Sequence, residues 1–519
     1  MIPHVLNFIL FLPLIGAAAV LLARRNNDAV RWTGLIFSLV TFVISLAVFF
    51  GYDPENPAMQ FVEKISWIPS LNVSYHLGLD GISMLLVVLT TFLTPIVLIS
   101  SWRSIDKQIA AYVALMLVLE TAMIGVFASL DTFLFYVFWE LILIPMYFII
   151  GIWGGKDRIY ATVKFFIYTM VGSLLMLIAI IWLGYYASTQ PGGVFTTDLL
   201  LLMDIAPTIP LGIQSWMFAA FALSFLIKVP AFPLHTWLPD AHVQAPTGGS
   251  VILAGVLLKM GTYGLIRFNL QLFPQASLEF ASVLSVLGVI GIIYGALVSM
   301  VQKDVKKLVA YSSVSHMGFI LLGIFGVTVS GMQGGLIQML NHGLSTGALF
   351  LLVGMIYDRR HTRMIEDFGG LARQIPVFST FFMIVTLSSI GLPGLNGFVG
   401  EILIMIGSFE SAVLGSIWYV VFAATGVVFA AVYMLWMYQR VVFGELKNPE
   451  NAKLVDLSAR EIGLLLPIML FIVWIGVYPS TFLSKSESTV QRVVRKLEQV
   501  HNPAQVQRGE ANTTTVSQP

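Results

Sequence analysis

The 519-residue chain contains no cysteine. This absence excludes disulfide bonds, and it also excludes an iron–sulfur cluster held by protein thiolates. The sequence also lacks a phosphate-binding loop of the G-x-x-x-x-G-K type and a G-x-G-x-x-G motif after a strand pattern, so a nucleotide site is not expected. We therefore expect no cofactor on this chain, and any redox chemistry coupled to it would take place on other proteins.

Charged residues are also scarce. They make up 11% of the chain, whereas soluble domains carry about 25%. Hydrophobic residues make up 57%, and the mean hydropathy is +0.87. The net charge of +1 gives no reason to expect a nucleic-acid partner. This composition is typical of an integral membrane protein whose main surroundings are the lipid bilayer.

Long apolar runs recur along almost the whole chain. A membrane-spanning helix needs about 20 predominantly apolar residues. Runs of this kind begin near residues 4, 32, 80, 109, 131, 163, 213, 246, 280, 306, 332, 377, 411 and 461. The sequence therefore predicts an all-α membrane protein with about fourteen transmembrane helices.

Three segments are more polar than these runs. Linkers at 51–79 and 188–212 are polar enough to lie outside the membrane, and the tail from Ser484 predicts a short helical stretch followed by partial disorder. The first run lacks a basic segment before it and an A-x-A-like cleavage site after it, so it predicts a membrane helix and not a removed signal peptide.

Basic residues gather in alternate loops. The loops after runs 1, 3, 5, 9, 11 and 13 hold Arg24, Arg25, Arg31, Arg103, Lys107, Lys156, Arg158, Lys164, Lys303, Lys306, Lys307, Arg359, Arg360, Arg363, Arg373, Arg440, Lys447 and Lys453. Short cytoplasmic loops carry the excess of Lys and Arg. We therefore expect a multi-pass protein of the bacterial inner (plasma) membrane, with both termini on the non-cytoplasmic side.

Two of the predicted helices contain breaks. Run 7 carries Pro230 and Pro233, and run 12 carries Pro393 between glycines. Proline removes a backbone donor, and paired interruptions are typical of transporter repeats. Five runs separate the breaks, which predicts two inverted five-helix repeats, runs 4–8 and 9–13. The expected parts are 1–108 (helices 1–3), 109–270 (first repeat), 280–440 (second repeat), 441–483 (last helix) and 484–519 (polar tail).

Ionisable residues lie in the middle of several of these runs. They are Glu120, Glu140, Lys228, Lys259, His316, His342 and Glu401. Such residues are costly in a membrane and face the protein interior or water. Burial favours the neutral forms of Lys and Glu, and His titrates near neutral pH, so the set predicts a proton relay. Simpler alternatives remain for single members: a static Glu140–Lys228 bridge, hydrogen-bonded core histidines, or a structural Glu120.

A further polar group follows the first break. His235, Asp240 and His242 could ligate a metal. The segment is short and has no cysteine, so a packed, hydrogen-bonded turn is the favoured interpretation and no metal is expected.

Two long motifs resemble a known family. The stretches KVPAFPLHTWLPDAHVQAPTGGSVILAGVLLKMGTYGL (228–265) and VQKDVKKLVAYSSVSHMGF (301–319) closely resemble the antiporter-like subunits of the proton-pumping NADH:quinone oxidoreductase, respiratory complex I. The resemblance extends over nearly the whole chain. Within the family it favours the subunit M branch, because Glu401 stands where the L and N branches usually carry a lysine, and because the tail is too short for the lateral helix of the L branch.

The resemblance implies roles for individual residues. It implies that Glu140 pairs with Lys228, that Lys259 is the central proton carrier, and that His316 and His342 bridge it to Glu401 as the terminal exchange group. Glu120 matches a further glutamate of the family in run 4, for which the resemblance implies no defined step. The resemblance also implies sister antiporter-like subunits on both sides, with redox chemistry in other subunits.

Two other functions stay open at this point. A subunit of a multi-subunit sodium/proton antiporter would share the pattern of Lys228 and Lys259. The broken helices also permit a stand-alone transporter of an organic solute, although the sequence offers no additional candidate site for one.

Overall fold

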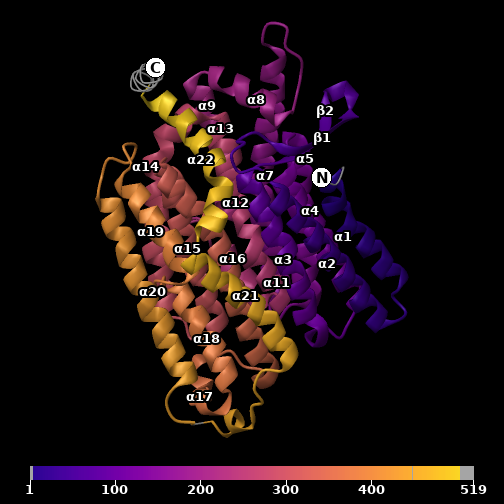
Figure 1. Cartoon of the computed structure of the whole chain (residues 1–519), viewed down its shortest axis with the longest axis vertical. Coiled ribbons are helices and arrows are strands. Elements are labelled where there is room, and N and C mark those ends of the chain that lie inside the picture. Colours follow the sequence, from indigo (N-terminus) through magenta and orange to yellow (C-terminus); the bar gives the residue numbers. More distant parts are fainter. Residues whose placement is uncertain (1–3, 447, 503–519) are drawn as a thin grey trace, which may run out of the picture.

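The computed structural model describes residues 4–446 and 448–502, and these residues are mostly α-helical (Figure 1). Among them, 13 helical segments are long and apolar enough to span a membrane. Two shorter helices, α18 (Pro376–Ser389) and α19 (Asn396–Phe409), together form one more, interrupted span. The prediction of about fourteen transmembrane helices is confirmed.

The 13 spans are, in chain order, α1 (Val5–Leu22), α2 (Asn27–Gly51), α3 (Gly81–Ser104), α4 (Ile109–Ala128), α5 with α6 (Thr132–Leu141 and Leu143–Trp153), α7 (Arg158–Ser188), α9 (Leu211–Lys228), α11 through α13 (Thr247–Leu272), α14 (Pro274–Met300), α15 (Val305–Phe325), α16 (Val329–Arg360), α20 (Trp418–Val442) and α21 (Ala459–Val477). The remaining elements are β1 (Gln60–Ile68), η1 (Pro69–Leu71), β2 (Val73–Leu79), α8 (Leu199–Ile205), η2 (Ala206–Thr208), α10 (Trp237–Gln244), η5 (Ile365–Asp367), α17 (Leu371–Gln374), η6 (Pro449–Lys453) and α22 (Ser480–His501).

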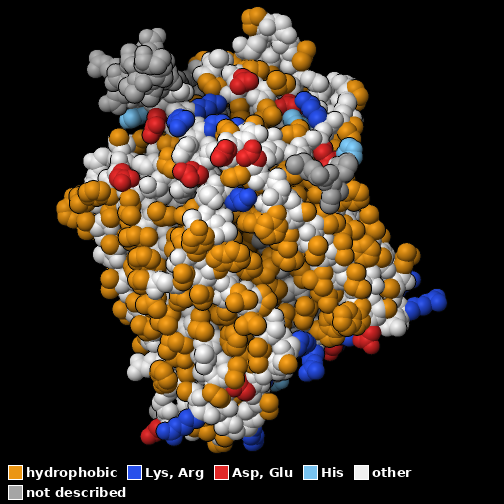
Figure 2. All heavy atoms as spheres, viewed as in Figure 1, with side chains coloured by type: hydrophobic (Ala, Val, Ile, Leu, Met, Phe, Trp, Pro, Cys, Tyr) orange, Lys and Arg blue, Asp and Glu red, His pale blue; other side chains and the backbone are white. Residues whose placement is uncertain are grey.

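The surface is divided into an apolar band and two charged ends. Figure 2 shows hydrophobic side chains covering the middle of the molecule, with charged side chains gathered toward its ends. Large side chains such as Phe50, Ile178 and Val428 are exposed within the spans. Such an extended apolar surface is not tolerated in water, and a bilayer provides the solvent that suits it.

The basic loops meet at one end of the molecule. The Trp153 indole nitrogen donates to the Lys107 carbonyl at 2.7 Å, and the Val305 amide donates to the Arg363 carbonyl at 2.9 Å. These contacts join loops that follow odd-numbered spans. Both ends of the described chain lie at the opposite end of the molecule (Figure 1), as an even number of spans requires.

The first predicted break is present after α9. This helix ends at Lys228, and Pro230 and Pro233 have no N–H to continue its hydrogen-bond ladder. The Ile227 carbonyl accepts instead from the indole nitrogen of Trp237, at 2.8 Å. This substitution satisfies a backbone group that could not be left unpaired in a membrane interior.

The second break separates α18 from α19. Gly391 and Gly394 both have positive φ angles, 73° and 91°, a region that glycine enters without steric cost. Asn396 then starts α19, and its side-chain oxygen accepts from the Gly397 amide at 3.0 Å and from the Ser388 hydroxyl at 2.5 Å. Side chains thus replace the backbone pairing that the break removes.

The span from Thr247 to Leu272 contains a deviation that its apolar run does not reveal. Two π-helical segments, η3 (Leu253–Leu257) and η4 (Leu265–Asn269), flank the short helix α12 (Leu258–Gly264). Every residue of the span from Gly248 to Leu272 is buried inside the protein. Single π-helical turns are rare and often occur at functional sites, and α12 carries Lys259.

The C-terminal helix α22 corrects one expectation. It runs for 22 residues, longer than the predicted short helical stretch, because Val490, Val493 and Leu497 form a buried stripe at helical spacing. The helix packs across α3, α14 and α16, as Figure 1 shows in yellow. The disorder predicted for the tail concerns residues 503–519, which lie outside the described residues.

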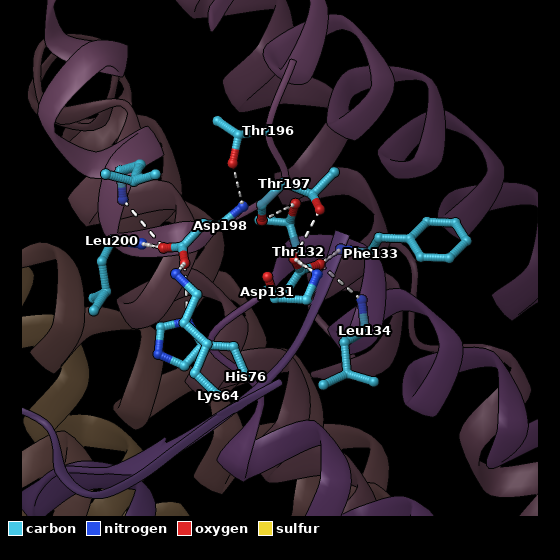
Figure 3. Close-up of polar contacts among 12 residues, drawn as sticks. Lys64, His76, Asp131, Thr132, Phe133, Leu134, Thr196, Thr197, Asp198 and Leu200 are labelled. Carbon is cyan, nitrogen blue, oxygen red and sulfur yellow. Dashed lines mark hydrogen bonds and ion pairs between the residues drawn. The ribbon is translucent and has the colours of Figure 1, made fainter. Parts of the chain in front are cut away.

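A β-hairpin, β1 with β2, occupies the linker at 51–79 and is fixed by carboxylates (Figure 3). Asp198 accepts from Lys64 at 2.7 Å and contacts His76 at 2.9 Å. Asp131 accepts from the Thr197 hydroxyl at 2.8 Å. Burial opposes ionisation of Asp198, but the hydrogen bonds from His76 and Lys64 outweigh it and lower its pKa to about 2. The cluster ties the hairpin to the starts of α5 and α8.

Candidate functional site

Four of the predicted residues form a continuous buried row. Lys259 Nζ lies 2.6 Å from His342 Nδ1. The rings of His342 and His316 follow, with their centroids 5.7 Å apart. His316 Nδ1 lies 3.4 Å from Glu401 Oε1. The four side chains come from α12, α16, α15 and α19, and each of these residues is no more than 5% exposed.

The π-helical backbone positions the first member of the row. Lys259 Nζ donates to the carbonyl of Ala254, five residues earlier and inside η3. In a regular α-helix that carbonyl would accept a hydrogen bond from the backbone amide of Leu258, four residues later. The local change of register therefore provides an acceptor for the ammonium group and holds it toward His342.

Close packing of α16 against α19 positions the last member. A Cβ on Gly407 would lie 2.1 Å from the Gly331 amide nitrogen, so only glycine allows the two backbones to approach this closely. Gln338 of α16 then reaches Glu401, with 3.4 Å between its amide nitrogen and Oε1. Asn341 donates to the Asn396 carbonyl at 2.7 Å. Gln338 thus contacts the carboxylate directly, and Asn341 ties α16 to the start of α19.

Lys228 and Glu140 form a second group, but not as the resemblance implies. No ion pair joins them within 4.0 Å, and Lys228 Nζ has no hydrogen-bond partner among the described residues. The ammonium nitrogen lies instead 3.8 Å from the ring centroid of Trp139, the residue before Glu140. A cation over an indole face is stabilised by the ring quadrupole. Lys228 therefore lies beside its expected partner without contacting it.

Glu120 lies apart from both groups. It is fully buried in α4, near Thr94 of α3. Neither of its carboxylate oxygens has a hydrogen-bond partner in the described part of the chain. A buried carboxyl group without a partner is costly, and no contact links Glu120 to the row or to Lys228 among the described residues.

The three residues considered for a metal have separate partners. His235 packs between the rings of Phe232 and Tyr294. Asp240 pairs with Lys164 at 2.7 Å. His242 stacks on Phe350, and no metal-holding group of His, Asp or Glu is found within residues 4–446 and 448–502. The segment is packed, but it is not the favoured hydrogen-bonded turn: Asp240 and His242 lie on the short helix α10, and neither ring nitrogen of His242 has a hydrogen-bond partner among the described residues.

Sequence reasoning missed a buried ion pair on the span that carries Lys259. Arg267, on η4, donates to Asp80 at 2.6 Å, and both side chains are at most 1% exposed. Arg267 also donates to the Tyr263 hydroxyl at 3.2 Å, and Tyr263 donates to the Phe127 carbonyl at 3.0 Å. An arginine inside the apolar run LIRFNL was the available signal. The pair anchors one end of the span that carries Lys259.

Comparisons with known proteins agree with this architecture. A family described as NADH:quinone oxidoreductase/Mrp antiporter, TM, matches residues 129–430. NADH-quinone oxidoreductase subunit M of Rhodobacter capsulatus is 46% identical over 493 residues, which cover 92% of this chain and 94% of that protein. NADH-ubiquinone oxidoreductase chain 4 of Marchantia polymorpha is 43% identical over 492 residues, which cover 94% of this chain and 97% of that protein.

The fold is also similar to a solved structure. A chain in the structure of respiratory complex I from Thermus thermophilus with bound NADH superimposes with a TM-score of 0.83 at 30% sequence identity. The superposition covers 94% of this chain and 99% of that one.

Proposed function

Because this chain belongs to the family of membrane subunits shared by NADH:quinone oxidoreductases and Mrp antiporters, and is a membrane subunit of the NADH-quinone oxidoreductase type, we propose that it moves protons through the row from Lys259 to Glu401. The observation that carries this proposal is the row of four buried titratable groups on four different helices, in which Lys259 contacts His342 and His316 lies 3.4 Å from Glu401. No apolar core needs such a row, and each member is costly to bury.

Each step of the row suits proton transfer. A proton on Lys259 passes to His342 across their 2.6 Å contact. The 5.7 Å separation of the two imidazole rings is short enough for transfer through one water molecule or after a ring rotation. His316 then delivers the proton to Glu401, 3.4 Å away. Lys259, His342 and His316 each return to the neutral form as the next group gains the proton, and the Glu401 carboxylate is neutralised when it accepts.

Lys228 is suited to control this transfer. Its ammonium group sits over Trp139 and next to Glu140, with no fixed hydrogen-bond partner among the described residues. A small movement toward Glu140 would form an ion pair that holds the Lys228 proton, and movement away would release it. We assign to this pair the coupling of proton transfer to conformational changes that begin in redox subunits of the complex. On this proposal the chain itself holds no redox centre.

The predicted orientation is also part of the proposal. With the basic loops facing the cytoplasm, both described ends of the chain face the other side of a bacterial plasma membrane. Sister membrane subunits of the complex would flank the chain.

Replacement of Glu401 tests the proposed relay directly. Glu401→Gln keeps the shape of the side chain but cannot titrate, so NADH-driven proton uptake by membrane vesicles should fall strongly. Glu401→Asp still titrates but is one methylene shorter, so it should keep part of the uptake. The alternative is that Glu401 only accepts from backbone amides freed by the helix break, in which case Gln would serve equally well. Near-normal uptake by the Gln variant, in a fully assembled complex, would refute the exchange role.

A further inference from the structure

A narrow groove of about 110 Å³ lies within the apolar band of the protein, where α2, α3, α16, α21 and α22 meet. These five helices lie on the face drawn in Figures 1 and 2. Every side chain that lines the groove is hydrophobic, and several are aromatic, among them Phe49, Phe92 and Trp474. The groove is therefore an indentation in the part of the surface that a bilayer covers.

The chemistry and size of the groove select a hydrocarbon chain as its occupant. Cavities with apolar walls stay dry, so water does not fill it. An α-helix with its side chains is about 10–12 Å across, whereas the free volume equals that of only about four water molecules. A helix of another protein is thus too wide to enter. A lipid acyl chain is narrow and apolar, and it is the solvent that surrounds these spans.

A cation stands at one edge of the groove. Lys485 Nζ lies 5.4 Å from the ring centroid of Phe49, which lines the groove. The same ammonium group donates to the carbonyl of Tyr52 at 3.3 Å. Tyr52 is the first residue after α2, so Lys485 lies where that span leaves the membrane. An ammonium group has three donor hydrogens, and an uncharged carbonyl takes one, so Lys485 retains donors and a positive charge for a lipid phosphate.

An aromatic side chain marks the same level. The Trp474 ring lines the groove, while its indole nitrogen donates to the Thr481 hydroxyl at 3.3 Å. Tryptophan is enriched where a span meets the headgroups, because its body is apolar and its N–H is polar. The groove therefore runs from the apolar interior of the membrane to a cation at headgroup level.

We propose that this groove and Lys485 form a binding site for a phospholipid of the bilayer. One acyl chain lies along the groove, and the phosphate accepts a hydrogen bond from the Lys485 ammonium group. The floor of the site belongs to α16, because Leu340 and Leu344, on either side of His342 in the sequence, both line it. The bound chain therefore fills the space behind the helix that carries His342. Binding of the lipid does not depend on the proposed relay.

Photo-labelling of the intact complex tests this site. The purified complex is equilibrated in detergent with phosphatidylglycerol that carries a photoreactive diazirine on one acyl chain, and the labelled peptides are identified by mass spectrometry. The wild type should carry label on the groove segments of α2, α3 and α21. Diacylglycerol with the same photoreactive chain lacks the phosphate, so it should label these segments about fivefold less, the effect of one Lys–phosphate attraction at a membrane surface.

Four variants separate the charge from the groove. Lys485→Gln should lower labelling by phosphatidylglycerol about fivefold without changing labelling by diacylglycerol, and Lys485→Arg should keep the wild-type pattern. Val88→Phe places a phenyl ring in the groove that half-buried Val88 lines, so it should lower labelling by both lipids. Arg495→Gln is the matched control, because it removes one exposed positive charge from α22 outside the groove, and it should label as the wild type does.

The outcomes decide the proposal without any measurement of proton uptake. Groove segments that stay unlabelled in the wild-type complex would show that a neighbouring subunit covers them, and the lipid site would be overturned. Equal labelling by phosphatidylglycerol and diacylglycerol, or undiminished labelling of Lys485→Gln, would overturn phosphate binding by Lys485. Neither result bears on the relay, so failure of the lipid site and failure of the proposed function are distinguishable.

Discussion

Gly261 lies where α12 crosses the broken end of α9, two residues after Lys259. A Cβ at this position would lie 2.6 Å from the Phe225 carbonyl oxygen and 2.8 Å from the amide nitrogen of Val229, the residue after Lys228. Both neighbours are backbone atoms, which cannot rotate away. To regain ordinary contact distances, Gly261→Ala must separate the two helices by roughly 0.5–1 Å. This substitution therefore moves Lys228 and Lys259 apart without changing any titratable group.

The expected effect on function is larger than the effect on stability. Overpacking of this kind costs about 1–3 kcal/mol, which a large assembled complex can absorb. Displacement of reacting groups by about 1 Å can lower a rate by up to about 100-fold. We therefore expect Gly261→Ala to assemble but to pump protons at least about tenfold more slowly, measured as NADH-driven uptake per assembled complex.

Gly212→Ala is the matched control for this experiment. Gly212 lies at the start of α9 and has no atom within 4 Å of a built Cβ. Alanine is the better helix former by about 1 kcal/mol, so this variant should assemble and pump as the wild type does. Wild-type uptake by Gly261→Ala would refute the claim that the close approach of α9 and α12 sets the geometry of the relay.

Three further predictions concern charged residues. Lys228→Ala should lower proton uptake and quinone reduction together in the same vesicles, because the two are coupled, while assembly survives; loss of only one rate would contradict this. Asp80→Asn keeps an acceptor for the Ile82 and Ser83 amides but leaves the Arg267 charge buried without a partner, which should cost about 3–5 kcal/mol. The cost should be visible as a lower melting temperature that Asp80→Asn with Arg267→Met recovers; equal melting of all three forms would count against the pair. Burial opposes ionisation of Asp198, but its hydrogen bonds with His76 and Lys64 outweigh burial and lower its pKa from 3.8 to about 2, so its contribution to stability is complete above pH 3.8 and is lost as the pH falls through about 2. Hydrogen exchange of the β1–β2 amides should rise over this range in the wild type but not in Asp198→Asn, and identical pH profiles would refute this assignment.

The sequence alone predicted features that depend on local composition. The thickness of a bilayer sets the length of each apolar run, so the number of spans could be predicted by counting such runs along the chain. The two breaks were predicted because proline has no backbone N–H, so it interrupts the hydrogen bonds of a helix in any tertiary structure. The relay residues could be identified because an ionisable side chain in an apolar run is costly in any arrangement of the helices. Each of these inferences needs only the chain and its solvent.

The contacts among those residues depended on tertiary packing. Lys259 and His342 are 83 positions apart, and His316 and Glu401 are 85 apart, so no spacing rule joins them. The π-helical register that orients Lys259 could not be predicted, because an apolar run does not distinguish hydrogen bonds to the fourth residue from those to the fifth. Only the tertiary structure placed Lys228 over Trp139 instead of on Glu140. Helix packing decides such contacts because it is set by the shapes of many side chains at once, whereas the sequence states the chemistry of each side chain separately.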